Sequence, residues 1–221
     1  MAAAKTSSAR SKDKRPGQPG GVRDTNRKQR TRQLLDAALL LFLERGIEGV
    51  SVDDITSSAK MAKGSFYRYF DDQTALVREL VRPTEEAAVA VFNRALKAIG
   101  TADTKELQAN VYNTMGEVLG TFLLEHAGVA RLYLQESRSP GVGARAPLVE
   151  LSKTVGRYAV QITERAQQHG ILKPIPPVIS ALAVVGAIER LLLGVLQEEP
   201  LGNPLEIPPH LVTLILDGLK A

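Results

Sequence analysis

Apolar residues recur at steps of three and four along almost the whole chain, which is the spacing of one face of an α-helix. The first such stretch covers residues 26–45 and ends at Gly46, a residue typical of the position just after a helix. Its apolar stripe consists of Leu34, Ala38, Leu41 and Phe42. No stretch of any length shows the alternation of a β-strand or the turn residues of a hairpin. The pattern therefore predicts an all-α protein.

Two short helices joined by a turn are predicted over residues 51–70. Ser51 caps the first helix, and Asp54, three residues later, completes a capping box. A tight turn then leads into a second helix over residues 63–70. Two short helices at a steep angle form the helix-turn-helix plan, in which the second helix enters the major groove of DNA.

Longer helices are predicted beyond this unit, with glycine and proline between them. A helix that begins after Asp71 or Asp72 is expected to end at Pro83, because the residue before a proline disfavours helical geometry. The remaining helices are expected over residues 84–100, 104–125, 126–136, 144–169, 178–196 and 208–219.

Positive charge is concentrated at the beginning of the chain. The net charge of all 221 residues is +4, but residues 1–32 hold ten Lys and Arg against two acids. The rest of the chain is therefore slightly acidic. We expect residues 1–24 to form a disordered basic arm that attracts a polyanion.

Composition argues against several classes of function. The chain has no cysteine, and its three histidines have no ligand-type spacing, so we expect no disulfide and no metal site. The motifs of hydrolases, metalloproteases and nucleotide-binding loops are absent, so we expect neither an enzyme nor a cofactor. Residues 178–196 are apolar enough for a membrane span, but Glu189 and Arg190 lie inside them. We expect a cytoplasmic protein with no membrane segment.

The second short helix carries polar and aromatic residues on its outward face. These candidate DNA contacts are Lys63, Ser65, Tyr67, Arg68 and Tyr69, and Gly64 leaves room for a phosphate to approach the backbone. Arg27 and Arg30 precede the unit and add non-specific attraction. Taken alone, such a helix also fits an ordinary surface helix.

The wider string from Arg27 to Leu80 resembles the TetR family of bacterial transcriptional regulators. The resemblance is carried by residues 35–42, Gly46, residues 50–55, Ala59, residues 63–70, Ala75 and Leu76. It implies a three-helix helix-turn-helix DNA-binding domain over residues 25–82. It also implies a larger helical domain over residues 83–221 that binds an effector and dimerises. The function it implies is a repressor that binds a palindromic DNA operator as a homodimer and is released by a small molecule.

The resemblance also assigns roles to single positions, with three departures. It places Ser51 near a phosphate and the aromatic residues Tyr67 and Tyr69 at phosphates or bases. Lys60 stands where the family has a turn glycine, Ala62 replaces the usual serine cap, and Gln73 replaces a lysine that faces phosphate. We therefore expect weaker DNA affinity from the domain itself, with the basic arm compensating.

The C-terminal part is expected to hold the dimer interface and the effector pocket. Helices 144–169 and 178–196 are expected to form the dimer interface, because the second is apolar nearly all round. The pocket is expected among residues 84–169. Candidate lining residues are Phe92, Tyr112, Met115, Phe122 and Tyr133, and candidate polar anchors are Glu117, His126 and Arg131.

Two other classes of function remain open from the sequence. An enzyme is disfavoured because the paired acids, such as Asp53 and Asp54, are adjacent on a helix and point in different directions. A helical protein that uses its basic arm to bind a membrane surface or a partner would prefer anionic vesicles over DNA.

Overall fold

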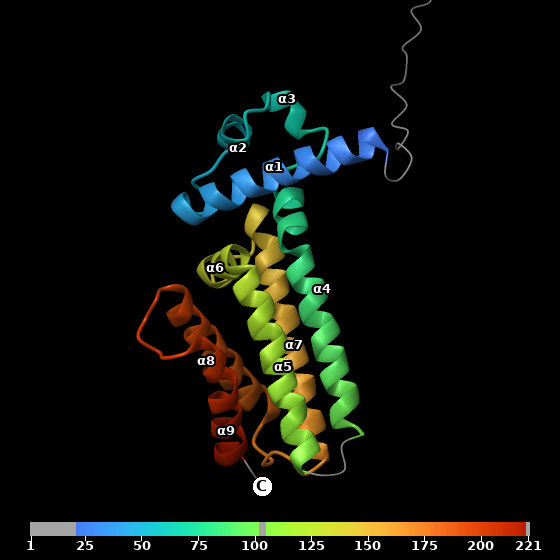
Figure 1. Cartoon of the computed structure of the whole chain (residues 1–221), viewed down its shortest axis with the longest axis vertical. Helices are drawn as coiled ribbons and strands as arrows, with labels where there is room; N and C mark the ends of the chain where they lie inside the picture. The colour runs from blue at the N-terminus through green and yellow to red at the C-terminus, as the bar shows by residue number, and fades with distance from the viewer. Residues whose placement is uncertain (1–20, 102–104, 220–221) are drawn as a thin grey trace, which may run out of the picture.

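The computed structural model of the protein describes residues 21–101 and 105–219, and within these ranges it contains helices and no strand. A small cap of three helices lies across one end of a long helical body (Figure 1). The main helices are α1 Val22–Arg45, α2 Val52–Ser58, α3 Lys63–Phe66, α4 Gln73–Ile99, α5 Lys105–Glu125, α6 Ala127–Glu136, α7 Ala146–Gln168, α8 Pro177–Leu196 and α9 Ile207–Leu219. Two short 3-10 turns are η1 Gly143–Arg145 and η2 Pro204–Glu206. The all-α prediction is confirmed.

The helix α4 passes through the proline at which we expected it to end. Pro83 lies inside α4, so the two helices predicted before and after it form one helix of 27 residues. A proline in a helix interior costs about 3 kcal/mol. Buried residues continue along one face on both sides of it, at Leu80, Val81, Thr84 and Ala88. Burial of each aliphatic side chain contributes about 1.5–3 kcal/mol, so packing of the uninterrupted helix outweighs the cost of Pro83.

The cap and the body share one hydrophobic core. Fully buried Leu34, Phe42, Ile55 and Phe66 from the cap belong to the same cluster as Leu132 and Leu148 of the body. A second cluster fills the far end of the body, with Phe92, Ile99, Ile162 and Ala166. The expected boundary between residues 82 and 83 thus falls within a continuous helix and beside a shared core.

The ends of the first and third helices differ from the prediction. The helix α1 begins at Val22 rather than near residue 26, and its first turns contain an ion pair of 3.0 Å between Asp24 and Lys28, one turn apart. Residues 22–24 of the expected disordered arm are therefore helical, and residues 1–20 lie outside the described part of the chain. The helix α3 ends at Phe66, and residues 67–69 continue as turns rather than as helix to residue 70.

Candidate DNA-binding surface and ligand pocket

The capping box predicted at the start of α2 is present. Ser51 Oγ accepts a hydrogen bond of 3.2 Å from the Asp54 backbone N–H, and the Asp54 carboxylate accepts one of 2.8 Å from the Ser51 N–H. The Ser51 hydroxyl also donates a hydrogen bond to Asp54 Oδ2. This bond and the one from the Ser51 N–H hold the pKa of Asp54 below its usual range. The box fixes the entry of α2, and Ile55 and Thr56 anchor the helix in the core.

The turn between α2 and α3 is strained, as its sequence predicts. Lys60 has a φ of 53°, in the left-handed region that glycine occupies more easily. The turn is closed by a hydrogen bond of 2.8 Å from the Met61 N–H to the Thr56 carbonyl. Ala62 stands at the N-cap of α3 and supplies no side-chain hydrogen bond. Lys60, which replaces a turn glycine, therefore adopts the left-handed conformation, and Ala62, which replaces a serine cap, leaves the start of α3 without a side-chain cap.

The helix α3 is held by one deeply buried ring and exposes its other face. Phe66 is fully buried and lies 5.6 Å from Phe70, measured between ring centroids. Tyr67 meets the Phe66 ring edge-on and remains 53% exposed. Tyr69 is half-buried and packs against the core, so only part of its ring faces solvent. Tyr67 is therefore the aromatic side chain of this segment that is free to meet another molecule.

The polar candidates of α3 lie around Tyr67. Lys63, Gly64 and Arg68 are exposed, and Ser65 is half-buried. A Cβ built on Gly64 would meet nothing within 4 Å, so internal packing does not require glycine here. The open space at Gly64 leaves the backbone accessible to a close approach from outside.

Lys63 has an acidic neighbour that the sequence pattern did not reveal. Its Nζ lies 2.7 Å from Asp53 Oδ2, although the two residues are ten positions apart. The hydrogen bond and charge of Asp53 raise the pKa of Lys63. The packing of α2 against α3 brings the pair together, so any phosphate that meets Lys63 competes with Asp53.

Of the remaining predicted DNA contacts, Gln73 is a structural tie, and Arg27 and Arg30 are exposed cations, of which Arg30 donates a hydrogen bond of 3.1 Å to Gln33 on the same helix. Gln73 Nε2 donates a hydrogen bond of 3.0 Å to the Val50 carbonyl and so joins the start of α4 to the loop before α2. Arg27 and Arg30 are exposed on α1, whose N-terminal turns extend past the top of α4 (Figure 1). The two arginines are therefore placed to attract an anion beside the cap.

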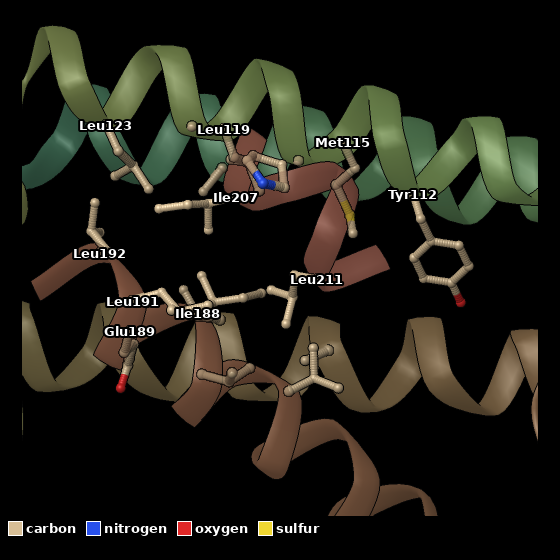
Figure 2. A pocket seen from close by; sticks show the side chains of 18 of the residues that line it. Tyr112, Met115, Leu119, Leu123, Ile188, Glu189, Leu191, Leu192, Ile207 and Leu211 are labelled. Carbon is tan, nitrogen blue, oxygen red and sulfur yellow. The ribbon is translucent and has the colours of Figure 1, made fainter. Parts of the chain in front are cut away.

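An apolar pocket lies inside the helical body. Its volume is about 280 Å³, and helices α4, α5, α7, α8 and α9 contribute most of its lining. Figure 2 shows side chains of α5, α8 and α9 converging on this space. All five predicted lining residues belong to it, namely Phe92, Tyr112, Met115, Phe122 and Tyr133.

Two expectations about this pocket are wrong. The pocket extends beyond residues 84–169, because α8 and α9 pack over the open side of α5 and α7 and line it as far as Ile215. Glu117, His126 and Arg131 are exposed and do not line it. His126 instead stacks on Phe122, with 4.1 Å between ring centroids. These three residues lie on the solvent sides of α5 and α6.

One carboxylate, that of Glu189, lies in the lining of the pocket. In the sequence it stands out only as a charge within an apolar helix. Glu189 of α8 accepts a hydrogen bond of 2.6 Å from the Tyr133 hydroxyl through one oxygen. Its other oxygen accepts one of 2.9 Å from Arg138. The apolar spacing of α8 could not identify these partners, because they come from α6 and the loop after it.

One face of α8 is apolar and exposed. Val178, Ile179 and Leu182 are each more than half exposed. Only 17% of the most apolar 18-residue stretch of the helix is buried within the chain. In the described part of the chain, α8 is the one helix long and apolar enough to cross a membrane. Glu189 and Arg190 lie in its second half, where a lipid environment would be costly.

Comparisons with known proteins agree with this arrangement. A family profile described as bacterial regulatory proteins, tetR family, matches residues 34–80. The chain is 27% identical over 145 residues to the HTH-type transcriptional regulator UidR of Escherichia coli (strain K12), covering 66% of this chain and 69% of that protein. It is 40% identical over 65 residues to the HTH-type transcriptional repressor KstR2 of Rhodococcus jostii (strain RHA1), covering 29% of this chain and 32% of that one.

The fold is similar to that of solved regulators. The transcriptional regulator FadR from Bacillus subtilis, solved in complex with stearoyl-CoA, superposes with a TM-score of 0.64 at 18% identity. The match covers 86% of this chain and 99% of that one. The ketosteroid transcriptional regulator KstR2 of Mycobacterium tuberculosis gives a TM-score of 0.63 at 17% identity, covering 87% and 95%. At these identities the likeness establishes the fold.

Proposed function

Because the chain belongs to the TetR family of bacterial transcriptional regulators, we propose that it is a repressor that binds a palindromic operator as a homodimer and is released by a small-molecule effector. The chain is a helix-turn-helix DNA-binding regulator, and its relatives are regulators rather than enzymes. The proposal includes the DNA-contact residues, the dimer, the effector and a cytoplasmic location.

The exposed face of α3 is the observation that carries the proposal. Buried Phe66 fixes α3 against the core, and Tyr67, Lys63 and Arg68 project away from it. A recognition helix requires this combination, because its contacts to base edges are useful only when the helix is held rigidly. Gly64 and exposed Ser51 at the cap of α2 are proposed to face phosphates.

The remaining cations of the cap are proposed to add sequence-independent affinity. Arg27 and Arg30 extend the exposed basic surface along α1. Residues 1–20, which the structure does not describe, carry five more Lys and Arg against one acid. Contacts between such cations and phosphates release counterions, so they give affinity that falls steeply with salt.

The dimer is proposed to form through α7 and α8. The apolar side of α8 leaves Val178, Ile179 and Leu182 each more than half exposed, and a second copy would cover these side chains. A two-fold dimer presents two α3 helices to successive major grooves, about 34–36 Å apart on one side of the duplex. The last helix α9 packs against α5 and also exposes an apolar side chain, Leu214.

Effector control is proposed to pass through α4. The helix begins at Gln73 beside the loop before α2, and its later turns line the pocket through Thr84, Ala88 and Phe92. An effector can release DNA only if it binds one arrangement of the cap better than another. The Bacillus subtilis relative is solved with stearoyl-CoA, whose acyl chain is apolar, and this supports an apolar binding space in a body of this fold.

The proposal is tested by fluorescence anisotropy with the DNA upstream of the chain's own gene. Tyr67→Ala is expected to weaken operator binding by about 1–3 kcal/mol and to relax specificity at one base position. Leu205→Ala is the control, because Leu205 is 69% exposed and lies in η2 at the start of the segment leading to α9. Unchanged binding by Tyr67→Ala would overturn the placement of the recognition helix, and preferential binding to anionic vesicles would favour a membrane-surface function.

A further inference from the structure

The cap is attached to the body by one continuous helix and by an apolar core. The helix α4 begins at Gln73 beside the cap and runs on into the body, and Leu34 of α1 shares a buried cluster with Leu132 of α6 and Leu148 of α7. Burial of apolar surface stabilises this attachment, but the hydrophobic effect is non-directional. Directional contacts are therefore needed to fix the orientation of the cap closely.

Glu136 makes such a contact from the body to the cap. Among the described residues it is the one charged residue that is buried, at 6% exposure, and it lies at the end of α6, which packs against α1. One carboxylate oxygen accepts a hydrogen bond of 3.1 Å from the backbone N–H of Ile47, in the loop that joins α1 to α2. A hydrogen bond weakens steeply when its angle closes, so this one restrains the loop in direction as well as distance.

Arg145 extends the contact to a second residue of the same loop. Its guanidinium pairs with the other Glu136 oxygen at 2.5 Å and also pairs with Glu48, and its side chain is only 16% exposed. A crevice of about 190 Å³ lies here, lined by residues of the loop and by residues 142–145. Because apolar packing leaves this space open, the charged bridge is what joins the loop to the body at this point.

The loop leads directly into the DNA-binding helices. The helix α2 begins at Val52, just after this loop, and packs against α3. The ion pair of Lys63 with Asp53 also joins these two helices. A shift of the loop therefore moves α2 and α3 together, so the contact at Glu136 is placed to set how α3 is presented to DNA.

We infer that Glu136 is a positioning residue for DNA binding: with Arg145 it fixes the orientation of the cap on the body, and so sets the distance between half-sites that the dimer accepts. The inference rests on the proposed function, because it concerns the two-fold operator proposed above. One added base pair moves a half-site by about 3.4 Å along the duplex and turns it by about 35°. A cap held in one orientation follows neither change, whereas a cap released from Glu136 adapts to both.

The test uses duplexes that differ only in the spacing of their half-sites. Site selection from random duplexes with the full-length protein gives the half-site. Synthetic duplexes then carry two inverted copies at the selected spacing, or with one base pair added or removed, and a duplex with a single half-site is the reference for the contacts of one α3. Fluorescence anisotropy measures the affinities, and the readout is the ratio of affinities at the selected and altered spacings.

Two variants break the bridge between Glu136 and Arg145. In Glu136→Gln the neutral amide oxygen still accepts from the Ile47 N–H, and in Arg145→Gln the pairing with Glu48 is lost as well. The wild-type spacing ratio is expected to be at least about tenfold, and both variants are expected to lower it to less than about threefold. Affinity for the single half-site is expected to change by less than about twofold, because the base-reading side chains are unaltered.

Arg82→Gln is the matched control. It makes the same charge change as Arg145→Gln and also removes two ion pairs, but both partners, Glu79 and Glu86, lie on α4 together with Arg82. It cannot release the cap, so its spacing ratio should stay at the wild-type value. Partial unfolding cannot imitate the expected result, since a smaller folded fraction lowers all affinities by one factor and leaves the ratio unchanged.

Each other outcome overturns the inference. A wild-type spacing ratio in either Glu136→Gln or Arg145→Gln would show that the bridge does not orient the cap. An equal loss of affinity for every duplex would leave Glu136 a purely structural role, and a lowered ratio in Arg82→Gln would make loss of charge the cause. A wild-type protein that accepts all spacings equally would show that the cap is not held in one orientation. The proposed function is tested separately, because it fails, and the inference with it, if the wild-type protein selects no inverted repeat.

Discussion

The carboxylate of Glu136 in α6 accepts a hydrogen bond of 3.1 Å from the backbone N–H of Ile47, which lies 89 residues earlier. The same carboxylate pairs with Arg145, and Arg145 also bridges to Glu48. Gly46 beside them has a φ of 72°, and a Cβ there would come within 3.2 Å of Glu136 Oε1. A buried acid of the body thus holds the loop between α1 and α2 of the cap.

The first prediction concerns this buried junction. Glu136→Gln keeps an acceptor for the Ile47 N–H but removes the charge that Arg145 requires, so the free energy of unfolding is expected to fall by about 2 kcal/mol. Urea unfolding followed by circular dichroism measures the change. Glu150→Gln is the control, because its ion pair with Arg78 is more than half exposed and should contribute less than about 1 kcal/mol. Equal losses in the two variants would contradict the assigned role of Glu136.

The second prediction concerns the cation of α3 that faces an acid. Asp53→Asn removes the carboxylate that holds Lys63, so affinity for all DNA sequences is expected to rise. The slope of log affinity against log salt should steepen by about one unit per subunit, because one more cation contacts phosphate. Anisotropy titrations at several salt concentrations measure both values. Glu86→Gln is the control, because it makes the same charge change on α4, away from α3, and should leave the salt slope unchanged. An unchanged salt slope in Asp53→Asn would show that Lys63 does not contact phosphate.

The third prediction concerns the strained turn. Lys60→Gly is expected to raise the free energy of unfolding by up to about 1 kcal/mol, because glycine adopts the observed φ of 53° without a steric penalty. The gain is limited by the larger entropy that glycine loses on folding. Chemical unfolding measures it, with Ser58→Gly as the control, since Ser58 is helical and exposed and glycine there should be destabilising. Destabilisation by Lys60→Gly would show that the turn is not strained.

The fourth prediction concerns alkaline pH. Burial raises the pKa of Tyr112 from 10.0 to about 12, so the folded state favours the neutral phenol. The contribution of Tyr112 to stability is fully present below pH 10, where the phenol is protonated in both the folded and the unfolded state. It is lost as the pH rises through about 12, and the full effect is roughly 2–3 kcal/mol. Tyr112→Phe should therefore reduce the alkaline loss of stability, measured as the free energy of unfolding from neutral pH to pH 12. Buried Tyr133, whose pKa is also raised, retains its share of that loss in this variant.

Local patterns determine what could be predicted from the sequence. The spacing of Leu34, Ala38 and Phe42 predicted α1, and the Ser51–Asp54 pair predicted the start of α2, because each depends on residues a few positions apart. Pro83 misled the prediction because its local preference is overridden by the buried face on both sides of it in α4. Tertiary packing of this kind cannot be read from one helix.

In the candidate sites, too, local patterns could be predicted and contacts between distant segments could not. Apolar spacing was sufficient to identify the aromatic residues of the pocket, since a buried face and a pocket lining share one pattern. The polar groups depended on contacts between distant segments, such as Tyr133 with Glu189 and Lys63 with Asp53. Charge alone suggested Glu117 and Arg131 as anchors, and both are exposed because they lie on the outer sides of their helices.

The central claim is that two copies of α3 read a symmetric DNA site. Selection of binding sites by the purified full-length protein from random duplexes tests this claim most directly. We predict enrichment of an inverted repeat whose half-sites are centred about 10–10.5 base pairs apart, or a multiple of that distance, with the preference at one base pair of each half-site relaxed in Tyr67→Ala. Enrichment of no sequence, or of a site without two-fold symmetry, would contradict the account.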